Sequence, residues 1–265
     1  TADAGVSGVS GLIALSTGAS GSGNSGAIFI GSGIARSGRA GGVSITGGLG
    51  DSGIGGEIVL IAGTTTSATA TGGKLIISSG VSAESDSGEL VLVTAFAGDY
   101  GQSGMIRLST GDGTCGNSGD IYIGTGSAES GRGGHVYITA GEGDSGTGGE
   151  LAIRGGFSSN ADIGTGGKIT ITSGIGTSTD SGELLFSTNN AGTKGTSGMI
   201  VLSTGDASCG NSGSLYIGTG SSASGRAGHV YVSTGEGDSG DGSEIVLTGG
   251  TSTGGTGGRV VISGG

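Results

Sequence analysis

Carboxylate and imidazole side chains recur at one fixed place in a repeated four-residue phrase of this sequence. His135 holds the first position of one phrase, with Asp120 and Glu150 at the equivalent positions 15 residues before and after it. Such groups serve as metal ligands and as acid–base catalysts. If consecutive phrases stack as strands about 4.8 Å apart, however, the three groups form a flat row that does not surround a metal. We therefore expect a charge ladder here.

The same ladder is predicted along the whole chain. Glu57, Lys74 and Glu89 follow one another in the first position, so opposite charges alternate. Each exposed pair contributes only about 0.2–1 kcal/mol. Together the pairs would oppose a slip of the register by one phrase.

Glycine-rich acidic segments raise the question of calcium or phosphate binding. Residues 141–146 read Gly-Glu-Gly-Asp-Ser-Gly, and residues 235–240 have a similar order. They lack the order of calcium-binding nonapeptide repeats, and no phosphate-loop motif precedes a helical pattern. No nucleophile–base set and no pair of carboxylates stands apart from the repeat. We predict no catalytic residue, no metal site and no cofactor, and hence no enzyme.

The phrase that carries these groups has aliphatic residues at its second and fourth positions, as in residues 57–60, and neighbouring phrases begin mostly 15 residues apart. Alternation of this kind predicts a strand, and a fixed period over the whole chain is typical of a solenoid. We predict an all-β fold, a single thin, flattened β-solenoid of about 17 rungs, with a triangular coil as the alternative. The second and fourth positions would form two aliphatic rows of a core, and the small sixth position would narrow the interior.

A longer period overlies the shorter one. Residues 109–119 return as residues 203–213, and earlier as residues 16–26, so that copies lie 93 or 94 residues apart. Six coils therefore form one super-repeat. We predict one continuous array over residues 1–265, with super-repeats at approximately 12–104, 105–198 and, in part, 199–265.

The third position of the phrase should face solvent, yet it is mostly apolar. A row of this length is a large apolar stripe, which indicates a covering partner, although β-propensity alone also favours these residue types. The partner would be another copy, a flanking part of a longer chain, or glycan. The stripe comprises Phe29, Val59, Ile76, Val91, Tyr122, Tyr137, Leu185, Val201, Tyr216, Tyr231, Val246 and Val261.

Two cysteines, Cys115 and Cys209, occupy equivalent places in two super-repeats. In a solenoid they would be roughly 29 Å apart, too far for a disulfide within the chain. One interpretation is that each fills a slot for a small residue, because serine stands there in other coils. An intermolecular disulfide between packed filaments and a reactive thiol are the alternatives.

The formal net charge of −11 argues against nucleic acid and against an anionic membrane surface as partners. No apolar run reaches the length of a membrane helix, and no secretory signal begins the sequence. The array starts and stops within the repeat, without a cap. We expect either a piece of a longer protein or chains that stack end to end.

Residues 118–126, Ser-Gly-Asp-Ile-Tyr-Ile-Gly-Thr-Gly, and residues 143–150 carry a resemblance to known proteins. They resemble the Gly/Ser/Thr-rich 15-residue-repeat β-solenoid surface and fibre proteins of microalgae, including diatoms and related lineages, and similar repeats occur in viral fibre proteins. The resemblance implies structural material outside the cell or on its surface. We expect a non-catalytic protein of an extracellular filament, appendage, wall or adhesive layer. An ice-binding solenoid is the alternative, and a carbohydrate-binding adhesin is a third.

Overall fold

A computed structural model describes residues 1, 3, 9–160 and 163–264 of the 265-residue chain. Within these residues there is no helix and no β-strand, and the chain is coil interrupted by short bends and turns. It divides into two units, Thr1–His135 and Val136–Gly265. The boundary falls inside a phrase of the repeat, between its first and second positions.

The predicted all-β solenoid is therefore wrong, and so are the rungs, the stacked strands and the β-helix architecture that followed from it. A strand ladder needs backbone hydrogen bonds between one phrase and the next. The backbone bonds recorded here instead close local loops, joining residues 8 to 11 positions apart, or 3 apart within a turn. Neighbouring phrases are not paired as strands in the described part of the chain.

The physical reason lies in the composition of each coil. Ordering a glycine costs about 0.5–1 kcal/mol more than ordering an alanine, and 70 of the residues are glycine. The Gly/Ser-rich half of a coil also offers almost no apolar side chain against which the aliphatic half could pack. Packing the Gly/Ser-rich half against a phrase would therefore bury little apolar surface. Ordering the glycines of that half would at the same time cost backbone entropy.

The predicted aliphatic core is also absent, because no described residue is buried. Among the large apolar side chains, those at the second position of the phrase are nevertheless the least exposed: Ile169 is 49% exposed and Ile121 is 52% exposed. The adjacent third-position Tyr122 is 91% exposed. The second and third positions of this phrase thus differ in exposure, as expected where successive side chains of an extended segment point to opposite sides. The fourth position does not share the protection of the second, because Leu60 is 61% exposed and third-position Val59 is 58% exposed.

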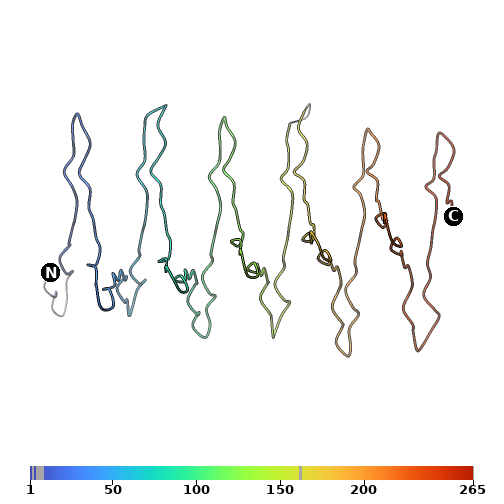
Figure 1. The fold of residues 1–265 in the computed structure, drawn as a ribbon, viewed down its shortest axis with the longest axis horizontal. Helices are drawn as coiled ribbons and strands as arrows, with labels where there is room; N and C mark the ends of the chain where they lie inside the picture. Colours follow the sequence, from blue (N-terminus) through green and yellow to red (C-terminus); the bar gives the residue numbers. More distant parts are fainter. Residues whose placement is uncertain (2, 4–8, 161–162, 265) are drawn as a thin grey trace. The chain divides into compact units, whose positions relative to one another are not determined.

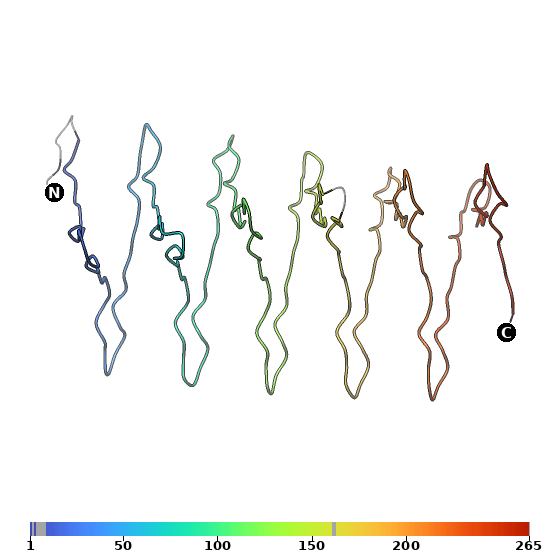
Figure 2. The ribbon, with the colours of Figure 1, turned by 90° about the horizontal axis from the view of Figure 1, so that it is seen from above.

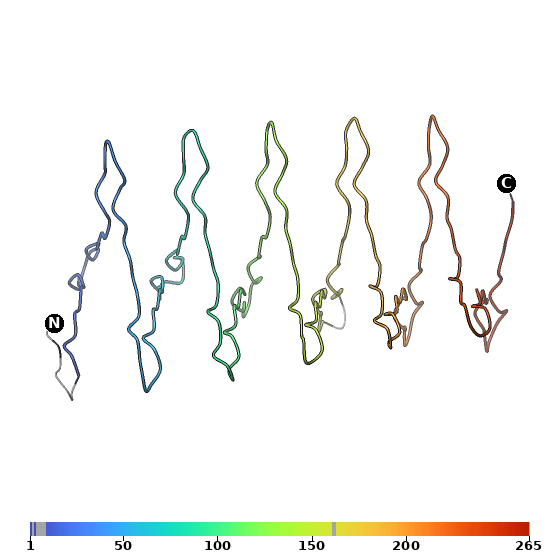
Figure 3. The same cartoon turned by 90° about the horizontal axis from the view of Figure 1, so that it is seen from below.

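The chain reverses direction in the Gly/Ser-rich half of each coil. Figures 1, 2 and 3 show long extended passes linked by sharp reversals in both units. In Thr1–His135 the bends and turns lie at 21–23, 36–38, 51–53, 68–69, 83–85, 99–100, 114–116 and 129–131. In Val136–Gly265 they lie at 144–146, 163, 177–179, 193–195, 208–210, 223–225, 238–241 and 253–255.

One of these bends requires glycine. Gly240 has a φ of 89°, in the left-handed region that side-chain-bearing residues rarely adopt. The bend belongs to the coil in which Ser243 stands where the other coils have a glycine before the phrase.

Candidate functional site

Each loop begins and ends at a pair of small residues, which we call the loop mouth. One member is the sixth position counted from the start of a phrase, and the other, the closing residue, immediately precedes the next phrase. Thr17 and Gly26 form one such mouth, and Gly47 and Gly56 form another. The mouths hold the two ends of each Gly/Ser loop together, and so set where the aliphatic phrases leave it.

In one class of mouth, a side-chain hydroxyl closes the loop. Thr17 donates from Oγ1 to the carbonyl oxygen of Gly26 at 3.1 Å, and Thr125 donates in the same way to Gly134 at 3.2 Å. The threonine methyl group lies against the glycine, because a Cβ built on Gly134 would be 3.0 Å from Thr125 Cγ2. The closing residue must therefore be small. The hydroxyl-closed mouths are Thr17/Gly26, Ser32/Gly41, Thr125/Gly134, Thr204/Gly213 and Thr219/Gly228.

In a second class, the backbone itself closes the loop. The Gly56 amide donates to the carbonyl oxygen of Gly48 at 2.8 Å, and the sixth position beside this bond is Gly47. A Cβ built on Gly47 would collide with the carbonyl oxygen of Gly56. The close approach of the two backbones thus depends on the missing side chain. Backbone bonds join Gly56 to Gly48, Gly73 to Gly63, Gly88 to Gly80, Gly149 to Gly141, Gly167 to Gly156, Gly182 to Gly174, and Gly258 to Gly250.

In most loops, the residue at the sixth position determines whether a hydroxyl or the backbone closes the loop. Threonine brings a hydroxyl and also a methyl group that keeps the two backbones apart, whereas Gly47 and Ala140 allow the backbone bond. In two longer loops the amide of Gly101 donates to Gly98, and that of Gly195 donates to Gly192, which forms an inner turn. Sequence reasoning predicted that the sixth position is small but missed its partner. The signal was the glycine that recurs nine residues later in most coils.

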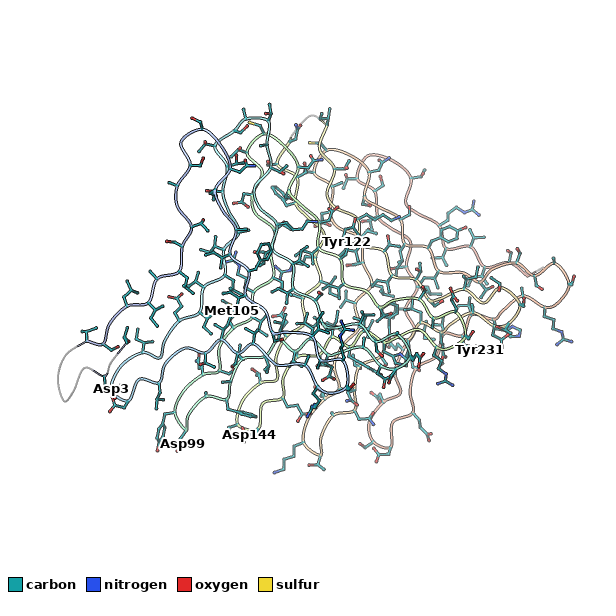
Figure 4. All side chains as sticks on the ribbon, turned by 60° about the vertical axis from the view of Figure 1, so that its left-hand side comes forward. Asp3, Asp99, Met105, Tyr122, Asp144 and Tyr231 are labelled. Carbon is teal, nitrogen blue, oxygen red and sulfur yellow. The ribbon has the colours of Figure 1, made fainter. Side chains whose placement is uncertain are left out.

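The apolar stripe is exposed in the structure. Phe29 is 95% exposed, and Val59, one of its most protected members, is still 58% exposed. Every stripe residue predicted from the sequence is more than half exposed. Figure 4 shows side chains extending away from the ribbon along the chain, with Tyr122 and Tyr231 labelled.

Side chains at the first and third positions of a phrase meet on the same side of the chain. The hydroxyl of Tyr122 donates to Asp120 Oδ2 at 3.4 Å. The rings of His229 and Tyr231 lie 5.7 Å apart at an interplanar angle of 55°. These contacts run along a phrase, whereas the predicted charge ladder required contacts between stacked phrases. Within residues 9–160 and 163–264 there are no strands to stack, so the predicted ladder geometry does not form there.

Among the described residues, no three His, Cys, Asp or Glu side chains come together in a way that could hold a metal ion. Asp144, from the acidic segment at 141–146, lies at a bend, and Figure 4 shows it at an outward reversal of the chain. At another bend, Asp51 contacts only the adjacent residue in the recorded hydrogen bond: the Ser52 hydroxyl donates to Asp51 Oδ1 at 3.0 Å.

Both cysteines are free thiols and exposed. Cys115 is the middle residue of the bend at 114–116, and Cys209 is the middle residue of the bend at 208–210. Ser22 and Ser130 stand at the middle of equivalent bends. The predicted slot for a small residue is thus the centre of a bend. The intermolecular disulfide stays a prediction.

No family model, no curated protein and no solved structure matches this chain. The resemblance to repeat proteins of microalgae therefore stays a prediction from the quoted phrases. Among the described residues, no helix is both long and apolar enough to cross a membrane.

Proposed function

We propose that this chain is a structural, non-catalytic protein that assembles with further copies of itself into extracellular material, such as a filament, an appendage, a wall or an adhesive layer. The observation that carries the proposal is the exposure of the apolar stripe together with the half-exposure of the aliphatic positions beside it. Apolar surface of this extent on a single chain marks a surface that a partner covers.

The free energy available from association can be estimated from the exposed fractions of the apolar side chains. Burying an aliphatic or aromatic side chain completely contributes about 1.5–3 kcal/mol. A second-position residue such as Ile169, half exposed, has about half of that still available. The second position of a phrase therefore offers about 1 kcal/mol to a contact, and the more exposed stripe residue of the same phrase offers more. Many phrases on one chain offer far more, because later contacts form at a high effective concentration.

Repetition favours a second copy as the partner. Most phrases present a similar surface, so the stripe of one chain can match that of another over many phrases. Contacts between like chains that do not close into a ring lead to open filaments. The placement of this material outside the cell rests on the resemblance of the repeat phrases alone, and glycan or a flanking segment would be alternative partners for the same stripe.

The proposal is tested with the full chain by analytical ultracentrifugation over a wide concentration range, followed by electron microscopy. We expect mass to rise with concentration and elongated assemblies to form. A matched pair of variants identifies the surface. Serine replaces the four stripe tyrosines Tyr122, Tyr137, Tyr216 and Tyr231, and the control carries alanine at four bend serines, Ser37, Ser130, Ser145 and Ser224.

Association should weaken at least tenfold in the tyrosine variant and remain unchanged in the bend variant. A chain that stays monomeric at every concentration would refute the proposal. Equal weakening in both variants would refute the role of the stripe.

The ice-binding alternative gains no support from the recorded hydrogen bonds. It needs ranks of threonine hydroxyls presented to water, but Thr17, Thr125, Thr204 and Thr219 donate within their loop mouths. Thermal hysteresis in dilute protein would reverse this ranking.

A further inference from the structure

We propose that Tyr122 and Tyr231 are sites at which copies of the chain become covalently linked by oxidative coupling of their phenols. The inference rests on the proposed function, because assembly is what would bring the phenols of two copies together. It adds a chemical step that the proposed function does not contain.

Access is the first requirement for coupling, and both side chains meet it. Tyr122 is 91% exposed and Tyr231 is 86% exposed, and both belong to the apolar stripe. Figure 4 shows the two labelled side chains on different parts of the chain. A phenol ring that is open to solvent can be reached by an oxidant and by the ring of another copy.

A neighbouring base is the second requirement, and it separates these tyrosines from Tyr216. Removal of an electron from a phenol is much easier when its proton passes to a base in the same step. Asp120 Oδ2 already accepts the hydroxyl of Tyr122 at 3.4 Å. The ring centroids of His229 and Tyr231 lie 5.7 Å apart, so a rotation of the exposed side chains would bring an imidazole nitrogen to the phenol hydroxyl.

The repeat supplies a natural comparison. Tyr216 stands at the same third position and is 96% exposed, but the residue two positions before it is Ser214, which is not a base at neutral pH. His135 precedes Tyr137 with the same spacing as His229 precedes Tyr231. Exposure alone predicts equal reactivity for Tyr122 and Tyr216, whereas the base predicts a preference for Tyr122.

The chemistry balances with a peroxide as oxidant, used by a haem peroxidase from the surroundings. Each of two phenols loses one electron and its hydroxyl proton and becomes a phenoxyl radical. The two radicals join through ring carbons ortho to oxygen, and the ring hydrogens at these carbons move to the oxygens, which restores both hydroxyls. Two tyrosines and one hydrogen peroxide thus yield one dityrosine and two waters.

The experiment uses the full chain with its two thiols alkylated, because free cysteines compete for the oxidant. Equal amounts of ¹⁴N- and ¹⁵N-labelled chain are mixed, light scattering records assembly, and horseradish peroxidase with hydrogen peroxide is added. Mass spectrometry of peptides then locates dityrosine, and mixed isotopes identify links between copies. A parallel sample contains a nitroso spin trap, which reports the phenoxyl radical at each tyrosine without any need for assembly.

We expect radical trapping at Tyr122 and Tyr231 to exceed that at Tyr216 at least threefold. Asp120→Asn, which removes the base but keeps the size, should lower trapping at Tyr122 at least threefold and leave Tyr231 unchanged. Ser214→His should raise trapping at Tyr216. Equal trapping at the three tyrosines, or no effect of Asp120→Asn, would overturn the assignment of these sites.

The two proposals fail in different ways. If scattering shows no assembly while trapping keeps the stated preference, the proposed function fails and the reactivity of the sites stands. If the chain assembles and the trapped radicals are preferred as stated, but no mixed-isotope dityrosine forms, the linking of copies is refuted.

Discussion

Replacing Gly47 by valine should open one loop mouth without affecting its neighbours. A Cβ at this position would collide with the carbonyl oxygen of Gly56, and the two γ-methyl groups of valine would hold the backbones apart, whereas alanine at the equivalent position 140 is compatible with backbone closure. That movement breaks the 2.8 Å bond from the Gly56 amide to the Gly48 carbonyl. A backbone bond of this kind contributes about 0.5–1.5 kcal/mol. Its loss corresponds to an increase of about 2- to 13-fold in the rate of hydrogen exchange at the Gly56 amide.

The adjacent glycine provides the control. A Cβ on Gly48 meets nothing within 4 Å, and the Gly48 carbonyl still accepts the bond. Gly48→Ala should stabilise the loop by about 0.4–1 kcal/mol through the unfolded chain and should slow exchange at Gly56. Exchange is measured by NMR on both variants at one pH and temperature. If the two variants change the Gly56 rate in the same direction, our explanation of backbone closure is wrong. The Gly149 amide, in another loop, should remain unchanged in both.

Three further predictions concern closure class, bend centres and association. Thr125→Ala removes a hydroxyl bond and a methyl group, so the loop should change to backbone closure: the Gly134 amide should bond to the Gly126 carbonyl, and its exchange should slow about 2- to 13-fold, as expected for a new backbone bond. Faster exchange at Gly134 would contradict this. Cys115→Ser should change the stability of its bend by less than about 0.5 kcal/mol, because it is an exposed position, and exchange at the flanking amides checks this. Raising the salt concentration should strengthen association in ultracentrifugation, because screening weakens repulsion between chains of net charge −11; weaker association at high salt would indicate that charge pairs hold the copies together.

The local features of the fold were predictable because they depend on neighbours in the sequence. Alternation in residues 120–123 predicted that Asp120 and Tyr122 share one side of the chain, and the contact between them confirms it. The small sixth position and the glycine after it predicted where the chain turns away from each phrase. Both predictions concern a few consecutive residues, whose side-chain directions follow from backbone geometry alone.

The strands and the core were not predictable in the same way. An aliphatic residue such as Ile169 can form a core only if another layer covers it, and the Gly/Ser half of the coil supplies only scattered apolar side chains, such as Leu49 and Phe96, which are themselves exposed. The period of the repeat is equally compatible with stacked rungs and with a series of separately closed loops. A small balance between apolar burial and the backbone entropy of glycine decides between them.

The candidate site shows the same division. The stripe could be located from the third position of the phrase, and Tyr122 and Tyr231 were among its residues. The loop mouths could not be located from the sequence, because the pairing of Thr125 with Gly134 depends on the chain returning to itself after nine residues. Sequence analysis identified both members as small without showing that they meet.

By itself, the sequence determined the period, the side of the chain that each phrase residue faces, and the small residues at each reversal. These follow from steric rules that act within a few bonds. The tertiary structure alone decided that the loops close on themselves, through a hydroxyl at Thr17 and through the backbone at Gly56, and that the aliphatic positions stay exposed. The physical reason is that pairing between distant segments must offset chain entropy, whereas a nine-residue loop closes at little cost.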